Sequence, residues 1–121
     1  VFQLDTKTGK ILQKISPTKK GDNDVNGIAV DDQFIYFGND NFQFFCYDMK
    51  GQKQWEVKTE NDCEAIPVLT DFNNDGKNDV IFTSQAKGVF AYDGTNGKLI
   101  WKDDFFEDLK NWNNKILKYT T

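Results

Sequence analysis

The chain of 121 residues is long enough for one domain with a hydrophobic core and too short for two. Its 15 basic residues are all lysines scattered through a sequence of net charge -4, so we expect no nucleic-acid-binding surface. Histidine is absent and no apolar run could span a membrane, which excludes histidine-dependent catalysis, the commonest zinc ligand and a transmembrane helix. Cys46 and Cys63 are too few for a disulfide scaffold, and either pair with each other or remain reduced thiols.

The N-terminal residues are expected to form a pair of short strands. Residues 2–5 and 10–15 have strand-like patterns and flank a turn that ends at Gly9. The polar, turn-rich residues 16–24 follow. We expect them to form a loop that crosses from this strand pair to the next unit.

The strand pair belongs to a repeat with a period of about 45 residues. An aspartate recurs at the end of an aromatic-rich strand and before a glycine turn: Asp5, Asp48 and Asp93. The strand after each turn carries a matching residue: Gln13, Trp55 and Trp101. Three carboxylates in register could indicate catalysis, but an aspartate just before a tight turn commonly accepts hydrogen bonds from backbone amides. We predict that capping role.

Each complete repeat is predicted to contain four short strands. In the last repeat these are residues 65–70, 79–84, 88–92 and 98–102. Four antiparallel strands in each unit of about 40–50 residues indicate a β-propeller blade. The sequence therefore predicts an all-β fold, namely a β-propeller segment of about two and a half four-stranded antiparallel blades.

The expected blade boundaries follow from the repeat. Residues 1–16 are the outer half of a blade, residues 17–59 a full blade, and residues 60–104 a second full blade. Residues 105–121 are a tail or the start of the next blade, and their pattern fits either a helix or a loop followed by a strand. Because a blade buries its faces against its neighbours, we expect a segment that associates with remaining propeller blades or with other subunits.

Residues 71–79 have the spacing of a calcium-binding loop. Ca²⁺ takes about six to eight oxygen ligands. Five predicted ligands lie at the required spacing: Asp71, Asn73, Asp75, the carbonyl of Lys77, and Asp79. Gly76 permits the sharp bend, whereas Phe82 stands where an EF-hand has glutamate, so the calcium spacing occurs here outside a helix-loop-helix. The matching turn of the preceding blade is only residues 31–33. A hairpin turn without metal is the alternative, but the crowded carboxylates favour a bound cation.

Two stretches resemble known β-propeller families. Residues 91–101 resemble the blade motif of PQQ-like propellers, the quinoprotein alcohol dehydrogenase-like group, because the pattern Ala-x-Asp-x-x-x-Gly-Lys-x-x-Trp is complete. Residues 46–55 follow it with one turn residue fewer, and residues 3–13 keep the Asp and the Gly-Lys pair. Residues 67–82 are similar to the FG-GAP repeats of integrin α-subunits, which carry a calcium loop between strands. The first resemblance implies that the two tryptophans pack between blades, and the second implies a bound Ca²⁺.

These features predict a non-catalytic, calcium-braced propeller segment that serves as a scaffold or binding module for a protein or glycan ligand. The alternative is part of a quinoprotein-type, PQQ-dependent dehydrogenase, in which a tryptophan would contact the quinone. The absence of histidine and arginine to hold an anionic cofactor argues against that alternative, and we assign no catalytic or cofactor-binding residue. Integrin-like calcium loops imply a calcium-rich location: extracellular, cell surface, periplasm or secretory lumen.

Overall fold

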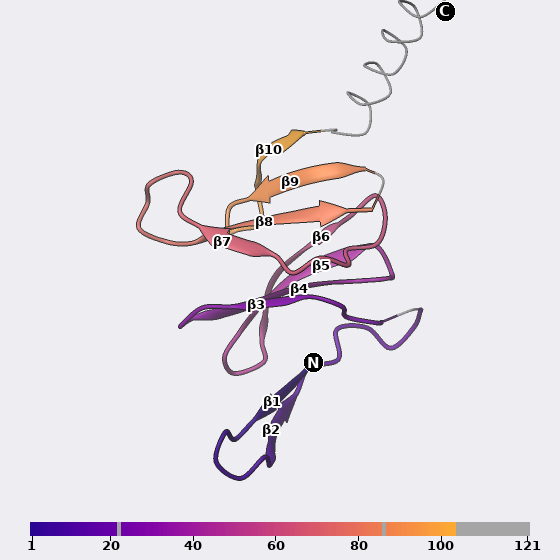
Figure 1. The fold of residues 1–121 in the computed structure, drawn as a ribbon, viewed down its shortest axis with the longest axis vertical. Coiled ribbons are helices and arrows are strands. Elements are labelled where there is room, and N and C mark those ends of the chain that lie inside the picture. The colour runs from indigo at the N-terminus through magenta and orange to yellow at the C-terminus, as the bar shows by residue number, and fades with distance from the viewer. Residues whose placement is uncertain (22, 86, 104–121) are drawn as a thin grey trace, which may run out of the picture.

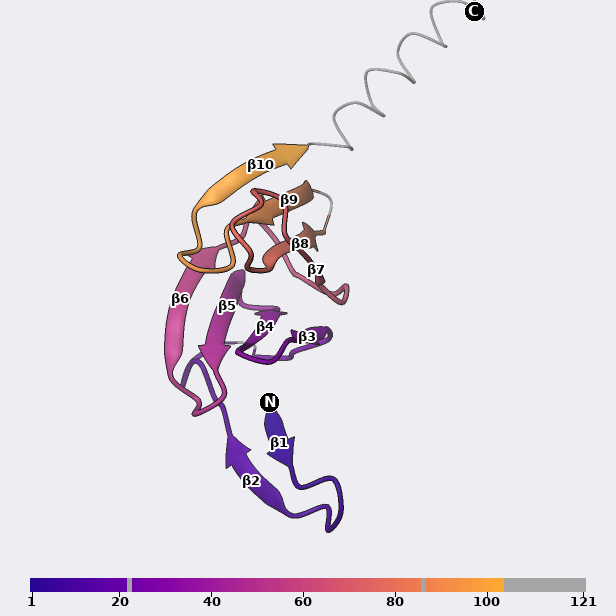
Figure 2. The same cartoon turned by 90° about the vertical axis from the view of Figure 1, so that its left-hand side faces the viewer.

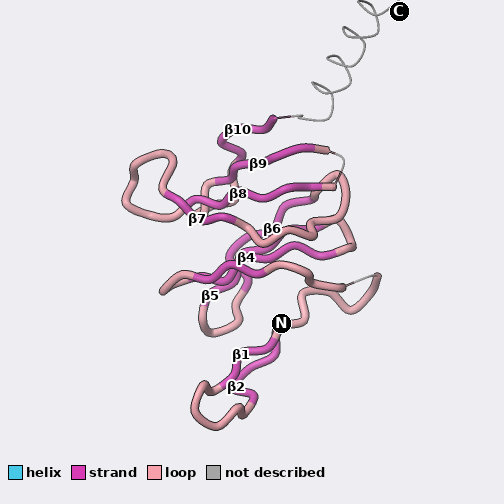
Figure 3. Tube along the Cα trace, viewed as in Figure 1, coloured by secondary structure: helices cyan, strands magenta, loops and turns pink. Residues whose placement is uncertain are grey.

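The computed structural model describes residues 1–21, 23–85 and 87–103, which form ten strands and no helix (Figure 3). The strands are β1 (Phe2–Leu4), β2 (Ile11–Lys14), β3 (Ile28–Val30), β4 (Phe34–Asn39), β5 (Gln43–Asp48), β6 (Lys53–Lys58), β7 (Val68–Thr70), β8 (Asp79–Ser84), β9 (Gly88–Tyr92) and β10 (Leu99–Asp103). Within these described residues there is no helix long and apolar enough to cross a membrane. The tail predicted at residues 105–121 lies outside them.

The strands form one hairpin and two four-stranded sheets (Figure 1). Strands β1 and β2 make the hairpin, strands β3 to β6 the first sheet and strands β7 to β10 the second, and every pair is antiparallel. Neighbours in each sheet are neighbours in sequence, which confirms the predicted antiparallel blades. Strands β8 and β9 have the predicted bounds, whereas β7 begins at Val68 and β10 ends at Asp103.

The hairpin and the two sheets follow one another along an arc (Figure 2). The short strands β3 and β7 lie on the concave side of the arc, and β6 and β10 lie on the convex side. Successive four-stranded sheets arranged in this way are blades, so the described chain is a β-propeller segment. We refer to β3–β6 as the first full blade, to β7–β10 as the second full blade, and to the interface between them as the seam.

The hydrophobic core lies between the sheets. In the seam, Phe44 of the first full blade stacks on Phe82 of the second with ring centroids 4.0 Å apart. The other buried members of this cluster are Tyr36, Cys46, Trp55, Cys63, Val80 and Phe90. A second cluster lies between the hairpin and the first full blade, and its buried members are Ile15, Ile35, Phe37, Phe45 and Tyr47. Alternate residues of β4 and β5 therefore face opposite neighbours, which is why both strands are almost wholly buried.

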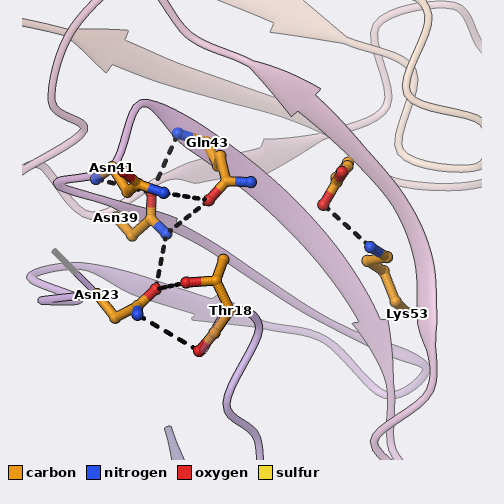
Figure 4. A network of polar contacts seen from close by, with 7 residues as sticks. Thr18, Asn23, Asn39, Asn41, Gln43 and Lys53 are labelled. Atoms are coloured by element: carbon orange, nitrogen blue, oxygen red, sulfur yellow. Dashed lines mark hydrogen bonds and ion pairs between the residues drawn. The ribbon is translucent and has the colours of Figure 1, made fainter. Parts of the chain in front are cut away.

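The loop that crosses from the hairpin to the first full blade is attached by a polar network (Figure 4). The side chain of Asn39 is fully buried, and its Nδ2 donates to Asn23 Oδ1 at 3.4 Å and to Gln43 Oε1 at 3.2 Å. Its Oδ1 accepts from the backbone amides of Asn41 and Gln43, each at 3.1 Å. Thr18 donates to Asn23 Oδ1 from the other side. The network fixes the crossing loop to the β4–β5 turn.

Both cysteines are free, buried thiols. Burial raises the pKa of Cys46 to about 12 and that of Cys63 to about 11. Since the thiolate is the reactive form, we expect the native protein at pH 8 to react with a thiol reagent about 100 times more slowly than a free cysteine, or slower still. Both thiols should react at once in denaturant. Fast labelling of either thiol in the folded protein would contradict this burial.

Candidate metal loop at the seam between two blades

The predicted calcium loop, residues 71–79, connects β7 to β8 and projects from the second full blade (Figure 1). We refer to it as the metal loop because of that prediction. Asp71 organises its backbone, because Oδ1 accepts from the amide of Asp75 at 3.1 Å and Oδ2 from the amide of Gly76 at 2.9 Å. Asn73 Oδ1 also accepts from the Asp75 amide, at 3.1 Å, and Asp75 Oδ1 accepts from the Lys77 amide at 2.9 Å. These bonds wrap the loop around the Asp71 carboxylate. The bend falls at Gly76, where φ is +83°.

Asp79 lies at the base of the loop and is only 1% exposed. One carboxylate oxygen accepts from the amides of Phe72 and Asn73, at 2.8 and 3.2 Å. The other accepts from the amide of Gly94 at 3.3 Å. A buried carboxylate must have hydrogen-bond partners, and here three backbone amides provide them. Asp79 therefore joins the start of the loop to the β9–β10 turn.

The donor chemistry of the loop fits a hard cation. Carboxylate and amide oxygens of Asp71, Asn73 and Asp75, with the Lys77 carbonyl, are the ligand types that Ca²⁺ prefers. In the described part of the chain, however, no group of three or more His, Cys, Asp or Glu side chains gathers closely enough to hold a metal. Asp79 is instead directed at backbone amides. The five-ligand calcium site stays a prediction from the sequence.

The loop also contacts the first full blade. Asn78 Nδ2 donates to Asp31 Oδ2 across the seam at 3.1 Å. Asp31 Oδ1 accepts from the amides of Gln33 and Phe34, at 2.9 and 2.7 Å, so Asp31 shapes its own short turn as Asp71 shapes the long one. No local sequence pattern indicates this contact, although Asp31 and Asp71 both stand directly after the first strand of a blade.

A pocket of about 300 Å³ opens beside this contact, at the end of the seam where the metal loop lies. The β3–β4 turn forms one wall and the metal loop and the β9–β10 turn form the other. The lining residues are mostly polar: Asp31, Asp32, Gln33, Phe34, Tyr36, Gly76, Lys77, Asn78, Gly94 and Thr95. Burial raises the pKa of Tyr36, and the nearby Cys46 and Asp31 raise it further, so its hydroxyl stays protonated. The pocket offers donors and acceptors from two blades to one ligand.

The three aspartates of the repeat cap turns, as predicted. Asp5 Oδ1 accepts from the amides of Lys7 and Thr8, at 2.9 and 2.8 Å. Asp48 Oδ1 accepts from two amides of its own turn, both at 2.9 Å, and Asp93 Oδ1 from one amide at 2.8 Å. The backbone hydrogen bonds lower the pKa of Asp5. These carboxylates belong to separate turns and form no shared site.

Trp55 packs between blades, as the resemblance implied. It is 8% exposed, and its indole Nε1 donates to the carbonyl of Gly94 in the second full blade at 2.9 Å. Gly94 must be glycine, because a Cβ there would collide with the carbonyl oxygen of Asn78 and approach the Tyr36 hydroxyl to 3.0 Å. Trp101, at the matching position of the second full blade, is 37% exposed and touches the ring of Phe72.

Comparison with known proteins supports the fold. No family model and no curated protein matches the sequence. Among solved structures, the chain is similar to BamB from Moraxella catarrhalis, with a TM-score of 0.57 and 18% identity, over 67% of this chain and 24% of that one. BamB is a PQQ-like β-propeller, so the likeness shows the propeller fold. The chain spans about a quarter of the length of BamB.

Proposed function

We propose that this chain is a non-catalytic, calcium-braced β-propeller segment that serves as a scaffold and binds a protein or glycan ligand at the end of the seam. The observation that carries the proposal is the meeting of the metal loop, the seam and a polar pocket at one place. Asn78 bonds to Asp31 across the seam, and the pocket lies beside that bond. The exposed groups around it, such as those of Asp32 and Lys77, suit a polar ligand.

The calcium part of the proposal rests on the loop. It combines FG-GAP-like spacing with a backbone already folded around Asp71. A cation bound by Asp71, Asn73 and Asp75 would offset the repulsion between the carboxylates and hold the loop against the seam. Such a loop suits a calcium-rich location outside the cytoplasm. The FG-GAP relationship itself is part of this proposal.

The quinoprotein alternative receives less support from the contacts. Trp55 is one of the two tryptophans that could contact a quinone, but its indole N–H donates to the carbonyl of Gly94 in the next blade. Among the residues that the structure describes, Lys77 is the one cationic residue that lines the pocket at the seam, and the sequence contains no arginine or histidine. A scaffold role therefore fits these residues better than a quinone site does.

We expect Ca²⁺ to raise the midpoint of thermal unfolding and a chelator to remove the rise. A ligand that binds only the folded state stabilises it, and each kcal/mol gained corresponds to about 4 °C in a domain of this size. Asp75→Ala should abolish the rise, because it removes a predicted calcium ligand. Since Asp75 is exposed, the substitution should leave the fold intact. Differential scanning fluorimetry or calorimetry would measure both effects.

Asp32→Ala is the matched control, since Asp32 is an exposed acid in the corresponding turn of the first full blade. It should leave the calcium response intact. If the wild-type protein is folded but its unfolding midpoint does not respond to excess Ca²⁺, residues 71–79 are an ordinary turn and the calcium part of the proposal is wrong. A response that Asp75→Ala leaves unchanged would place the cation elsewhere.

A further inference from the structure

The polar pocket at the end of the seam lies between two full blades of this chain, and each blade supplies one of its walls. Its volume is about 300 Å³, which is at the lower limit for sites that enclose a small molecule. The pocket therefore has room for one side chain of a larger ligand, and the rest of such a ligand would lie outside it.

Negative charge is concentrated on the wall that the β3–β4 turn forms. Asp31 and Asp32 are adjacent there, and Asp32 is exposed. Asp31 is held in place by two backbone amides, which donate to Oδ1, and by the Asn78 side chain, which donates to Oδ2. A carboxylate oxygen can accept more than one hydrogen bond. Oδ2 of Asp31, with one donor among the described residues, can therefore accept another from a ligand.

These two acids are not neutralised within the described part of the chain. The one ion pair there joins Lys53 to Glu56, neither of which lines the pocket. Lys77 stands on the opposite wall and pairs with neither aspartate. Two carboxylates thus face one ammonium group, and the pocket has a net negative charge.

The buried side of the pocket also suits a positively charged group. Tyr36 is 1% exposed, and its hydroxyl lies beside Gly94, which has no side chain to cover it. Burial contributes most to the raised pKa of this hydroxyl, and the carboxylates of Asp31 and Asp79 raise it further. The protonated hydroxyl can accept a hydrogen bond from an N–H donor. The half-buried ring of Phe34 offers an apolar surface to an aliphatic stem.

We propose that this pocket binds a basic side chain, lysine or arginine, that a protein ligand presents. The charged group bonds to Asp31 Oδ2 and to the Asp32 carboxylate, and the stem lies on Phe34. The two carboxylates would repel an acidic glycan, and a neutral glycan would leave their charge uncompensated. The inference rests on the ligand site proposed above, and it narrows the ligand of that site from a protein or glycan to a protein.

The test is the binding of N-acetylated, C-amidated tripeptides to the ¹⁵N-labelled protein, followed by NMR in the presence of a chelator. Gly-Arg-Gly and Gly-Lys-Gly should shift the backbone amide signals of Gln33, Asn78 and Gly94 in a saturable manner. Gly-Gln-Gly and Gly-Glu-Gly should not. Saturable binding of either basic peptide at these amides supports the proposal, and the tighter of the two identifies the preferred side chain, since arginine bonds in a planar fork and lysine as a point charge.

Two substitutions at exposed residues should change the affinity in opposite directions. Asp32→Asn removes an attracting charge and should weaken the basic peptides by about twofold to fivefold, the range expected for exposed ion pairs. Lys77→Gln removes a repelling charge and should strengthen them by a similar factor. General destabilisation would weaken binding in both variants. Asp75→Ala is the matched control, because Asp75 does not line the pocket, and in chelator it should bind the peptides like wild type.

The calcium response of thermal unfolding, measured on the same variants, separates this inference from the proposed calcium brace. Asp32→Asn should keep that response and lose peptide affinity, whereas Asp75→Ala should do the reverse. If neither basic peptide shifts these signals in the folded wild type, or if the glutamate peptide binds as well as they do, the inference is wrong even where the calcium response is present. Unchanged affinity in Asp32→Asn, or weaker binding in Lys77→Gln, would also contradict it.

Discussion

Trp55→Ala is expected to lower the free energy of unfolding by about 3–5 kcal/mol, as the truncation of a large buried aromatic side chain does. The ring of Trp55 packs beside Tyr36 and stacks on Phe44, with centroid distances of 6.2 Å in both cases. Its indole N–H donates a hydrogen bond to the Gly94 carbonyl of the next blade. Alanine would leave a cavity in the seam and an unsatisfied buried carbonyl. Equilibrium denaturation followed by far-UV circular dichroism would measure the loss.

Trp55→Phe separates packing from hydrogen bonding, and it keeps the test informative if the alanine variant does not fold. It retains an aromatic ring and loses the N–H donor, so the expected loss is about 1–3 kcal/mol for the unsatisfied carbonyl and the smaller ring. If both variants unfold like wild type, Trp55 does not hold the seam together.

Asp79→Ala is expected to cost about 3 kcal/mol, because three backbone amides lose a charged acceptor. Two of those amides begin the metal loop and the third belongs to Gly94, whose carbonyl accepts from Trp55. The substitution therefore loosens the loop and the seam together. Chemical denaturation in the presence of a chelator is the appropriate measurement, because it removes any contribution from bound Ca²⁺.

The comparison with Asp75→Ala distinguishes the two roles of these carboxylates. In chelator, Asp79→Ala should remain strongly destabilising, whereas Asp75→Ala should change stability little, since Asp75 is exposed and bonds only within the loop. Asp79→Asn, which keeps an acceptor oxygen at the same place, should lie between wild type and Asp79→Ala. If the effect of Asp79→Ala vanishes in chelator, its main role is in metal binding, as the sequence spacing predicted.

The blade fold could be predicted because strand and turn signals recur with the repeat. Differences at strand ends have local causes. The outer strands β2 and β10 start one residue later than expected, because Lys10 and Lys98 use their carbonyls to close the preceding turns. Strand β7 starts at Val68, after Pro67, which has no N–H to donate to a ladder. Such details depend on turn closure and pairing partners, which apolar patterning does not specify.

The candidate site was only partly predictable. The capping aspartates follow from local turn chemistry, and that prediction is confirmed. The bond from Asn78 to Asp31 and the use of Asp79 by three amides depend on how two sheets stack, so no local pattern indicates them. The repeat alignment places Gln13 at the position of Trp55. The structure shows that the Gln13 side-chain amide bonds to the backbone of Lys50 and Gly51 in the next blade, as the Trp55 indole bonds to that of Gly94.

The connection between the first two strands of a blade is longer in the second full blade than in the first, although both strand pairs are antiparallel. Four residues, 31–34, lie between the paired residues Val30 and Ile35, and eight residues, 71–78, lie between the paired residues Thr70 and Asp79. Doubling the length of a loop costs only about 0.6 kcal/mol in chain entropy. A blade can therefore carry a short or a long connection at little cost in stability, and grafting residues 71–78 in place of residues 31–34 is a route to a chain in which both full blades carry the loop that we propose binds Ca²⁺.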